Sequence, residues 1–228
     1  MNTLVTISLH PQNILAIKGY NEETAPYVAA AVTAFDEAYQ GLCAIHEARI
    51  AVSKNPTLNS AAQLVAVAEF ADKRMTRILR AIDSASTSLQ RGITGIEEML
   101  SAPLQQKANS AFTAEIRAHV KSLSVSERRQ FLSEAQHTGD LQTLEAVLGA
   151  PGYLSGISIE EKSIRTRIYH SNRAPEQVRR LEVMKLAFDL LGQRGGLVHS
   201  GVEKAIGASW AEVNRIKKAK AQAEEAFR

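Results

Sequence analysis

Residues 58–101 read LNSAAQLVAVAEFADKRMTRILRAIDSASTSLQRGITGIEEMLS, and this stretch decides the fold. Positions separated alternately by three and four residues are mostly apolar, as in the heptad repeat of a coiled coil. Eleven of the thirteen positions are apolar, where a hydrophobic content of 45% would give about six. The thirteen are Leu58, Ala61, Val65, Ala68, Asp72, Met75, Leu79, Ile82, Ser86, Leu89, Ile93, Ile96 and Leu100.

This repeat predicts one long helix that packs lengthwise against another helix and ends at Pro103. Its expected interaction seam consists of Val65, Met75, Leu79, Ile82, Leu89, Ile93, Ile96 and Leu100. The two polar positions, Asp72 and Ser86, have two readings. They either specify the register at a cost in stability, or face water where the seam rotates.

A shorter amphipathic helix is expected before it, from about Thr24 to Ser53, with Asn55-Pro56 ending it. Apolar or aromatic residues recur there at steps of four and three: Val28, Val32, Phe35, Tyr39 and Leu42, followed by His46. The two helices would form a long antiparallel hairpin over residues 21–104, in which the second overhangs the first by roughly 20 Å.

The overhang carries Leu89, Ile93 and Ile96, which need a cover. The N-terminal segment, the C-terminal region or another subunit could supply it. Because glycine weakens a helix, Gly92 and Gly95 also allow a break between Ser84 and Gly95.

The first twenty residues predict a β-hairpin. Two short β-branched runs, Leu4–Leu9 and Ile14–Ile17, flank His10-Pro11-Gln12-Asn13, whose Pro and Asn favour a turn. An isolated hairpin is marginally stable in water, so it would pack on the helices or offer its edge to another chain.

Residues 111–228 predict a compact domain of short helices, separated from the hairpin by a polar joint at Gln105–Ser110. Ser126, Asp140 and Ser209 are expected to cap helices, and Ser158 with Glu161 forms a capping box. Gly139 and Pro151 are expected to follow helix ends, and Pro175 to begin a helix. The fold class expected is mainly α, with any sheet confined to residues 3–18.

Composition supports a soluble protein of a reducing compartment. Cys43 is the one cysteine, the net charge is +3, and no apolar run reaches the roughly 18 residues that span a bilayer. We expect no membrane partner and no signal peptide.

No motif indicates catalysis, a cofactor or a metal. His46-Glu47 lacks the second histidine of a zinc motif, because Ile50 occupies its place, and Glu134 with His137 has no companion pair. Cys43 has only His46 nearby to activate it. The chain is therefore expected not to be an enzyme.

Nucleic-acid binding is the alternative function. Two short helices separated by Gly207-Ala208-Ser209 resemble a helix-turn-helix, although Glu203 occupies a position that is usually small. The outward contacts would be Asn214, Arg215, Lys217 and Lys218. The basic stretch Lys73–Arg80 is interpreted as a solvated helix face with i,i+4 ion pairs.

Several stretches of the C-terminal half resemble helical proteins of tailed-phage and prophage gene clusters. They are Glu127-Arg128-Arg129, Gly139-Asp140, Leu144–Pro151, Tyr153–Gly156, Gly195–Val198 and Ala205–Ala208. The resemblance implies a virion or virion-assembly setting, so the expected location is a virion or the (host) cytoplasm. It transfers no functional residue. The leading expectation is a non-enzymatic structural or assembly protein, a homo-oligomer or a partner of other virion proteins, which acts through helix packing.

Overall fold

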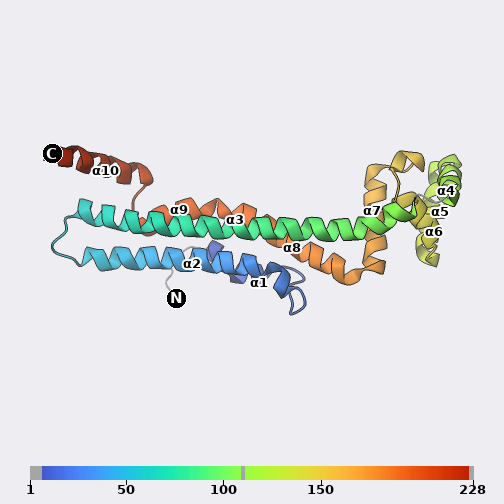
Figure 1. The fold of residues 1–228 in the computed structure, drawn as a ribbon. Helices are drawn as coiled ribbons and strands as arrows, with labels where there is room; N and C mark the ends of the chain where they lie inside the picture. Colours follow the sequence, from blue (N-terminus) through green and yellow to red (C-terminus); the bar gives the residue numbers. More distant parts are fainter. Residues whose placement is uncertain (1–6, 109–110, 226–228) are drawn as a thin grey trace. The chain divides into compact units, whose positions relative to one another are not determined.

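The computed structural model describes residues 7–108 and 111–225, and these residues form helices without strands (Figure 1). The mainly α class is therefore confirmed. In chain order the elements are the 3-10 helix η1 (Ile7–Leu9), α1 (Gln12–Leu15), α2 (Ala25–Ser53), α3 (Ser60–Lys107), α4 (Ala111–Ser122), α5 (Val125–Thr138), α6 (Leu141–Leu148), the 3-10 helix η2 (Gly152–Leu154), α7 (Ile159–Arg173), α8 (Pro175–Gly195), α9 (Leu197–Ile206) and α10 (Trp210–Glu225).

The chain divides into two compact units. Unit 1 comprises residues 1–92 and 183–228, and unit 2 comprises residues 93–182. Both α3 and α8 run through the division, whereas the sequence predicted a boundary at residues 105–110. Pro103 does not end α3, because Leu104 is buried in the core of unit 2 and the helix continues to Lys107.

The predicted N-terminal β-hairpin is wrong for the described residues, and Leu4–Thr6 of its first strand lie outside them. The Asn13 side-chain amide donates hydrogen bonds to the carbonyl oxygens of Ile7 at 2.9 Å and His10 at 2.8 Å. Such local bonds replace the pairing that a strand would need. Leu9 and Ile14 are fully buried, so tertiary packing overrides the β propensity of this segment.

Unit 1 is organised around α2. The helices α2 and the first part of α3 lie side by side and antiparallel (Figure 1), and Arg77 of α3 forms an ion pair with Glu37 of α2 at 2.8 Å. On another side, α9 packs along α2, with Gly201 against the methyl groups of Leu42. Gly201 lets the backbone of α9 approach α2 closely.

The buried stripe of α3 departs from the heptad positions. Ala71, Ile78 and Ala85 are buried beside the heptad positions Asp72, Leu79 and Ser86, while Val67 is buried outside the repeat and Ala61 of the repeat is exposed. Asp72 is exposed, Ser86 is partly buried, and Leu79 is 42% exposed, so its assignment to the seam is wrong. The reason is Gly41, because a Cβ there would come within 2.8 Å of Ile78 Cδ1. The side chain of Ile78 therefore packs against Gly41, in the space that a larger residue would fill.

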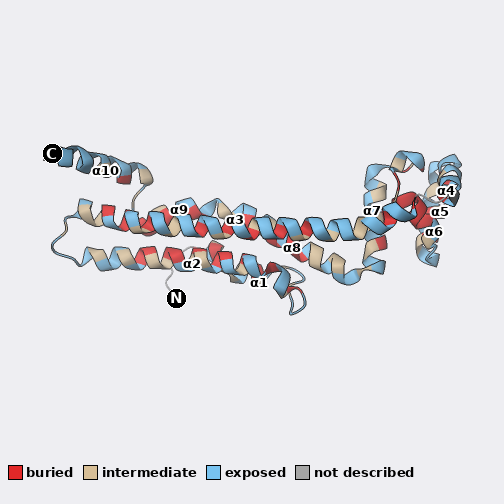
Figure 2. Ribbon diagram, in the orientation of Figure 1, coloured by how far each residue is buried: buried red, intermediate tan, exposed pale blue. Residues whose placement is uncertain are grey.

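The far part of α3 is covered by the chain itself. Leu89 and Ile93 are 1% and 5% exposed (Figure 2). Within unit 1, Met184 of α8 lies so close to Gly92 that a methyl group added to this glycine would overlap it. The sequence allowed three segments to cover this part of α3, and of these the C-terminal region lies beside Gly92. The allowed break does not occur, because α3 is continuous through Gly92 and Gly95.

Unit 2 surrounds α6, whose residues Thr143–Leu148 are all buried and which contacts α4, α5 and α7. The Asp140 cap and the helix-ending Gly139 occur as predicted. Ser158 caps α7 by accepting a hydrogen bond from Glu161 N at 3.1 Å, but the Glu161 carboxylate pairs with Arg165 at 3.0 Å instead of completing the predicted capping box. Helix α5 begins earlier than expected, because Ser124 rather than Ser126 is the cap. Ser124 and Glu127 form a reciprocal capping box, with Glu127 accepting from Ser124 N at 3.0 Å.

Replacing Ile78 with Ala should lower the free energy of unfolding by about 2–5 kcal/mol, because a fully buried side chain leaves a cavity. Leu79→Ala should cost less than about 1 kcal/mol, since that side chain already contacts water. Urea unfolding of both variants, followed by circular dichroism, compares the two neighbours directly. A larger loss for Leu79 than for Ile78 would contradict the register of α3.

Candidate interaction sites

The predicted interaction seam is largely internal. Val65, Ile82, Leu89 and Ile93 are buried, and Met75, Ile96 and Leu100 are partly buried. Ile82 of α3 is the neighbour of Gly195 at the end of α8, so a helix of the same chain occupies the seam in unit 1. Leu100 lies in unit 2 and borders an open groove.

That groove, here called the α3–α7 groove, has a volume of about 250 Å³ and lies within unit 2. Met99, Leu100, Pro103 and Leu104 of α3 supply its apolar wall, and Met99 is 61% exposed. Its other lining residues are Lys107, Tyr169, His170, Arg173, Ala174 and Gln177. A concave apolar surface with a cationic rim suits a protein segment that carries both apolar and acidic side chains.

A buried carboxylate lies behind the groove. Glu145 of α6 is 7% exposed, and its Oε1 accepts hydrogen bonds from Tyr169 OH at 2.8 Å and from Lys107 Nζ at 2.7 Å. A buried charge requires such partners, so the three side chains fix α3, α6 and α7 to one another. The sequence could not reveal this cluster, because its members lie 24 and 38 residues apart.

Burial shifts the pKa of two side chains that line the groove, in opposite directions. Burial, followed by the hydrogen bond to Glu145 and its negative charge, raises the pKa of Tyr169 to about 12. Burial lowers the pKa of His170, which favours the neutral imidazole at pH 7. The cationic part of the rim is therefore Lys107 and Arg173.

Two other arginines of unit 2 are structural. Arg165 is 8% exposed and donates to Gln136 Oε1 at 2.6 Å, while its Nε pairs with Glu161 at 3.0 Å. Arg128 donates to the carbonyl oxygens of Val120, Leu123 and Gly156. Both guanidinium groups donate their hydrogen bonds to acceptors of the same chain, so they are poorly placed to bind a ligand.

The residues that the sequence considered for catalysis do not come together. Burial raises the pKa of the Cys43 thiol more than its hydrogen bond with Tyr39 lowers it, so the thiol is less readily ionised. Glu134 and His137 are exposed on α5. Among residues 7–108 and 111–225, no group of three or more His, Cys, Asp or Glu side chains is arranged to hold a metal ion.

The helix-turn-helix-like region consists of α9, a turn with Gly207 at φ +83°, and α10. Val213 is fully buried and holds α10 in place. Asn214, Arg215 and Lys218 are exposed, whereas Lys217 is partly buried. Glu203 has a local role, because its carboxylate accepts a hydrogen bond from Trp210 N at 2.9 Å and so caps α10.

Tyr169 should titrate near pH 12. Because the folded-state pKa exceeds the ordinary value of 10.0, the stabilisation from the retained proton is present below pH 10 and is lost between about pH 10 and about pH 12. Subtracting the tyrosinate absorbance of Tyr169→Phe from that of the wild type isolates this group, and circular dichroism at each pH monitors unfolding. A difference curve centred near pH 10 in folded protein would contradict the cluster.

Comparisons with known proteins assign this chain to no family. No family model matches the chain, and searches of curated proteins and of solved structures give no significant match. No helix in the described part of the chain combines the length and the apolar character needed to cross a bilayer.

Proposed function

We propose that this chain is a non-enzymatic structural or assembly protein that forms a homo-oligomer through helix packing. In this proposal α2 and α3 form a rigid, coiled-coil-like hairpin, and unit 2 makes the contact between subunits. A virion or its assembly is the setting, which follows from the resemblance of the C-terminal half to tailed-phage proteins.

The α3–α7 groove is the observation that carries the proposal. Met99 exposes 61% of its surface beside partly buried Leu100 and the buried Leu104. Methionine fills irregular apolar gaps well, because its side chain is unbranched and flexible. An exposed methionine in a concave apolar surface is therefore well suited to insertion into a partner.

A second copy of the chain is the occupant that the charges favour. Glu98 is exposed next to Met99 on α3, and Arg173 is exposed on the groove lining. In a two-fold contact each copy offers both groups, so Glu98 of one copy can face Arg173 of the other. The apolar floor supplies the affinity, and the charge pairs at the rim set the orientation.

Nucleic-acid binding through α9 and α10 is the second candidate. The burial of Val213 supports it, because Asn214, Arg215 and Lys218 then lie on the opposite, exposed side of α10. The acidic Glu212 on the same helix and the capping role of Glu203 weigh against close base contacts.

Replacing Met99 with Lys should convert the oligomer into a folded monomer, because a charged side chain cannot enter the apolar groove of the second copy. Size-exclusion chromatography with light scattering measures the mass, and circular dichroism checks that the helical content is retained.

Leu79→Lys is the matched control, since it places the same charge on an exposed leucine of α3 in unit 1. That variant should keep the mass of the wild type. A wild type that is monomeric at the highest soluble concentration, or a Met99→Lys variant with unchanged mass, would refute the homo-oligomer proposal.

A further inference from the structure

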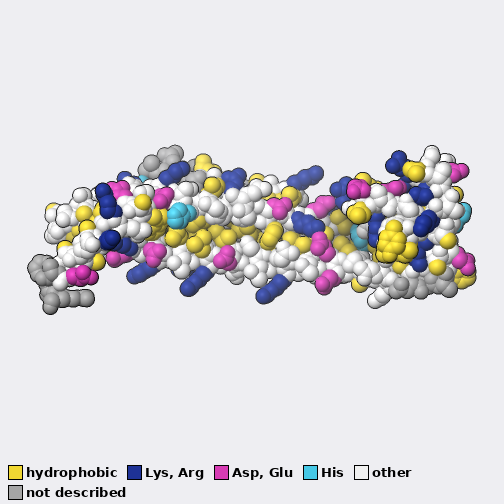
Figure 3. Space-filling view, turned by 90° about the horizontal axis from the view of Figure 1, so that it is seen from above, with side chains coloured by type: hydrophobic (Ala, Val, Ile, Leu, Met, Phe, Trp, Pro, Cys, Tyr) yellow, Lys and Arg dark blue, Asp and Glu magenta, His cyan; other side chains and the backbone are white. Residues whose placement is uncertain are grey.

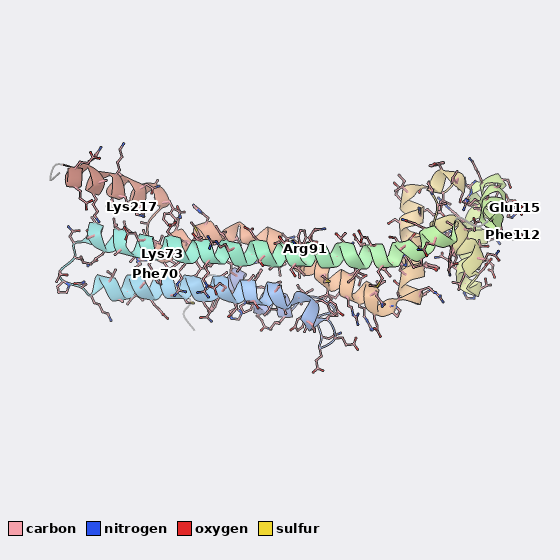
Figure 4. All side chains as sticks on the ribbon, viewed as in Figure 1. Phe70, Lys73, Arg91, Phe112, Glu115 and Lys217 are labelled. Carbon is pink, nitrogen blue, oxygen red and sulfur yellow. The ribbon has the colours of Figure 1, made fainter. Side chains whose placement is uncertain are left out.

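The solvent side of α3 carries a continuous basic stripe within unit 1. It consists of Lys73, Arg77, Arg80, Ser84, Thr87 and Arg91, all of them exposed. These positions are separated alternately by four and three residues, so they lie on one side of the helix. The buried stripe of Ala71, Ile78 and Ala85 lies on the opposite side. Figure 4 shows Lys73 and Arg91 on α3, and Figure 3 shows Lys and Arg side chains projecting in a row along one edge.

The six positions of the basic stripe contain four cations, two hydroxyls and no carboxylate. Arg77 is paired with Glu37, whereas no carboxylate in the described part of the chain forms an ion pair with Lys73, Arg80 or Arg91. The two units also differ in charge. Unit 1 holds 16 Lys and Arg against 13 Asp and Glu, and unit 2 holds 11 of each. The net positive charge of the chain therefore belongs to unit 1.

We propose that the basic stripe binds the phosphate backbone of duplex DNA without reading its sequence. From Lys73 to Arg91 the stripe is about 27 Å long, close to the roughly 34 Å of one duplex turn. Long cationic side chains with serine and threonine hydroxyls between them are the groups that contact phosphate oxygens most often.

A membrane surface fits the basic stripe less well than DNA does. A helix that lies on a bilayer inserts the apolar face opposite its basic face. On α3 that opposite face is the buried one, with Ile78 fully covered by the core of unit 1. The stripe itself offers no aromatic or aliphatic anchor to a lipid surface.

This inference is independent of the proposed homo-oligomer, because it uses unit 1 and the oligomer contact uses unit 2. It also differs from binding through α9 and α10, whose contacts are Asn214, Arg215, Lys217 and Lys218 on another helix. Variants of the three surfaces therefore separate the three proposals.

The test measures binding of the full chain to a fluorescein-labelled mixed-sequence DNA duplex of about 30 base pairs, about 100 Å long, by anisotropy at several salt concentrations. The stripe variant carries Lys73→Gln, Arg80→Gln and Arg91→Gln together. The matched control carries Lys18→Gln, Lys54→Gln and Lys121→Gln, which removes the same net charge from exposed side chains outside all three surfaces. A third variant, with Lys73→Arg, Arg80→Lys and Arg91→Lys, preserves the charges of the stripe. A fourth, with Arg215→Gln, Lys217→Gln and Lys218→Gln, tests the α10 surface separately. Circular dichroism melting verifies that each variant is folded.

We expect the wild type to bind, and the stripe variant to bind roughly tenfold more weakly or worse at low salt. The slope of log K against log salt should become shallower by roughly 2.7, which corresponds to three lost phosphate contacts. The control and the charge-preserving variant should both stay close to the wild type.

Three results would overturn the proposal. The first is a wild type that does not bind the duplex at low salt. The second is a control that loses as much affinity as the stripe variant, or a charge-preserving variant that loses as much. The third is co-sedimentation of the wild type with phosphatidylserine vesicles, abolished in the stripe variant, while DNA binding is unchanged.

Discussion

Unit 1 depends on large side chains that insert opposite glycines. Three such pairs each join two helices: Ile78 with Gly41, Met184 with Gly92, and Leu42 with Gly201. At these points the absence of a Cβ sets how closely the helices approach, because protein interiors leave few voids. The register of α3 and the cover of its far part both follow from these pairs. Since the pairs fix which side of α3 is buried, they also fix which side carries the basic stripe.

The heptad repeat and the local capping signals allowed much of the fold to be predicted. The repeat predicted a long helix over α3, although it left a break near Gly92 open and placed the end at Pro103. Asp140 and Ser158 marked helix starts, because caps act over three residues of the chain. The choice between Ile78 and Leu79 could not be made in this way. Both are large and apolar and adjacent in the chain, and the residue that decides between them, Gly41, lies on a different helix. Hydrophobicity also undervalued Ala71 and Ala85, which are both buried although alanine is only weakly apolar.

Two further features depend on side-chain hydrogen bonds that neither residue propensity nor periodicity reveals. The segments Leu4–Leu9 and Ile14–Ile17 have the composition of strands. However, the Asn13 side chain donates hydrogen bonds to the backbone carbonyls that a strand partner would otherwise bind. The α3–α7 groove is bordered by the Glu145 cluster, which exists only after three helices have come together. Of the predicted seam, only Leu100 contributes to the groove. The exposed Met99 beside it was not predicted, because it lies outside the heptad positions.

The groove and the basic stripe differ in the physical force that each would use. An apolar contact in the groove depends on surface removed from water, which moderate salt does not weaken. A phosphate contact on the stripe depends on the release of counterions, so it weakens steeply as salt increases. Because α3 runs through the division between the units, one continuous helix carries the stripe in unit 1 and an apolar wall of the groove in unit 2. If the protein associates through the groove and binds DNA through the stripe, high salt should therefore release the DNA while the subunits stay associated. This order follows from the different chemistry of the two surfaces.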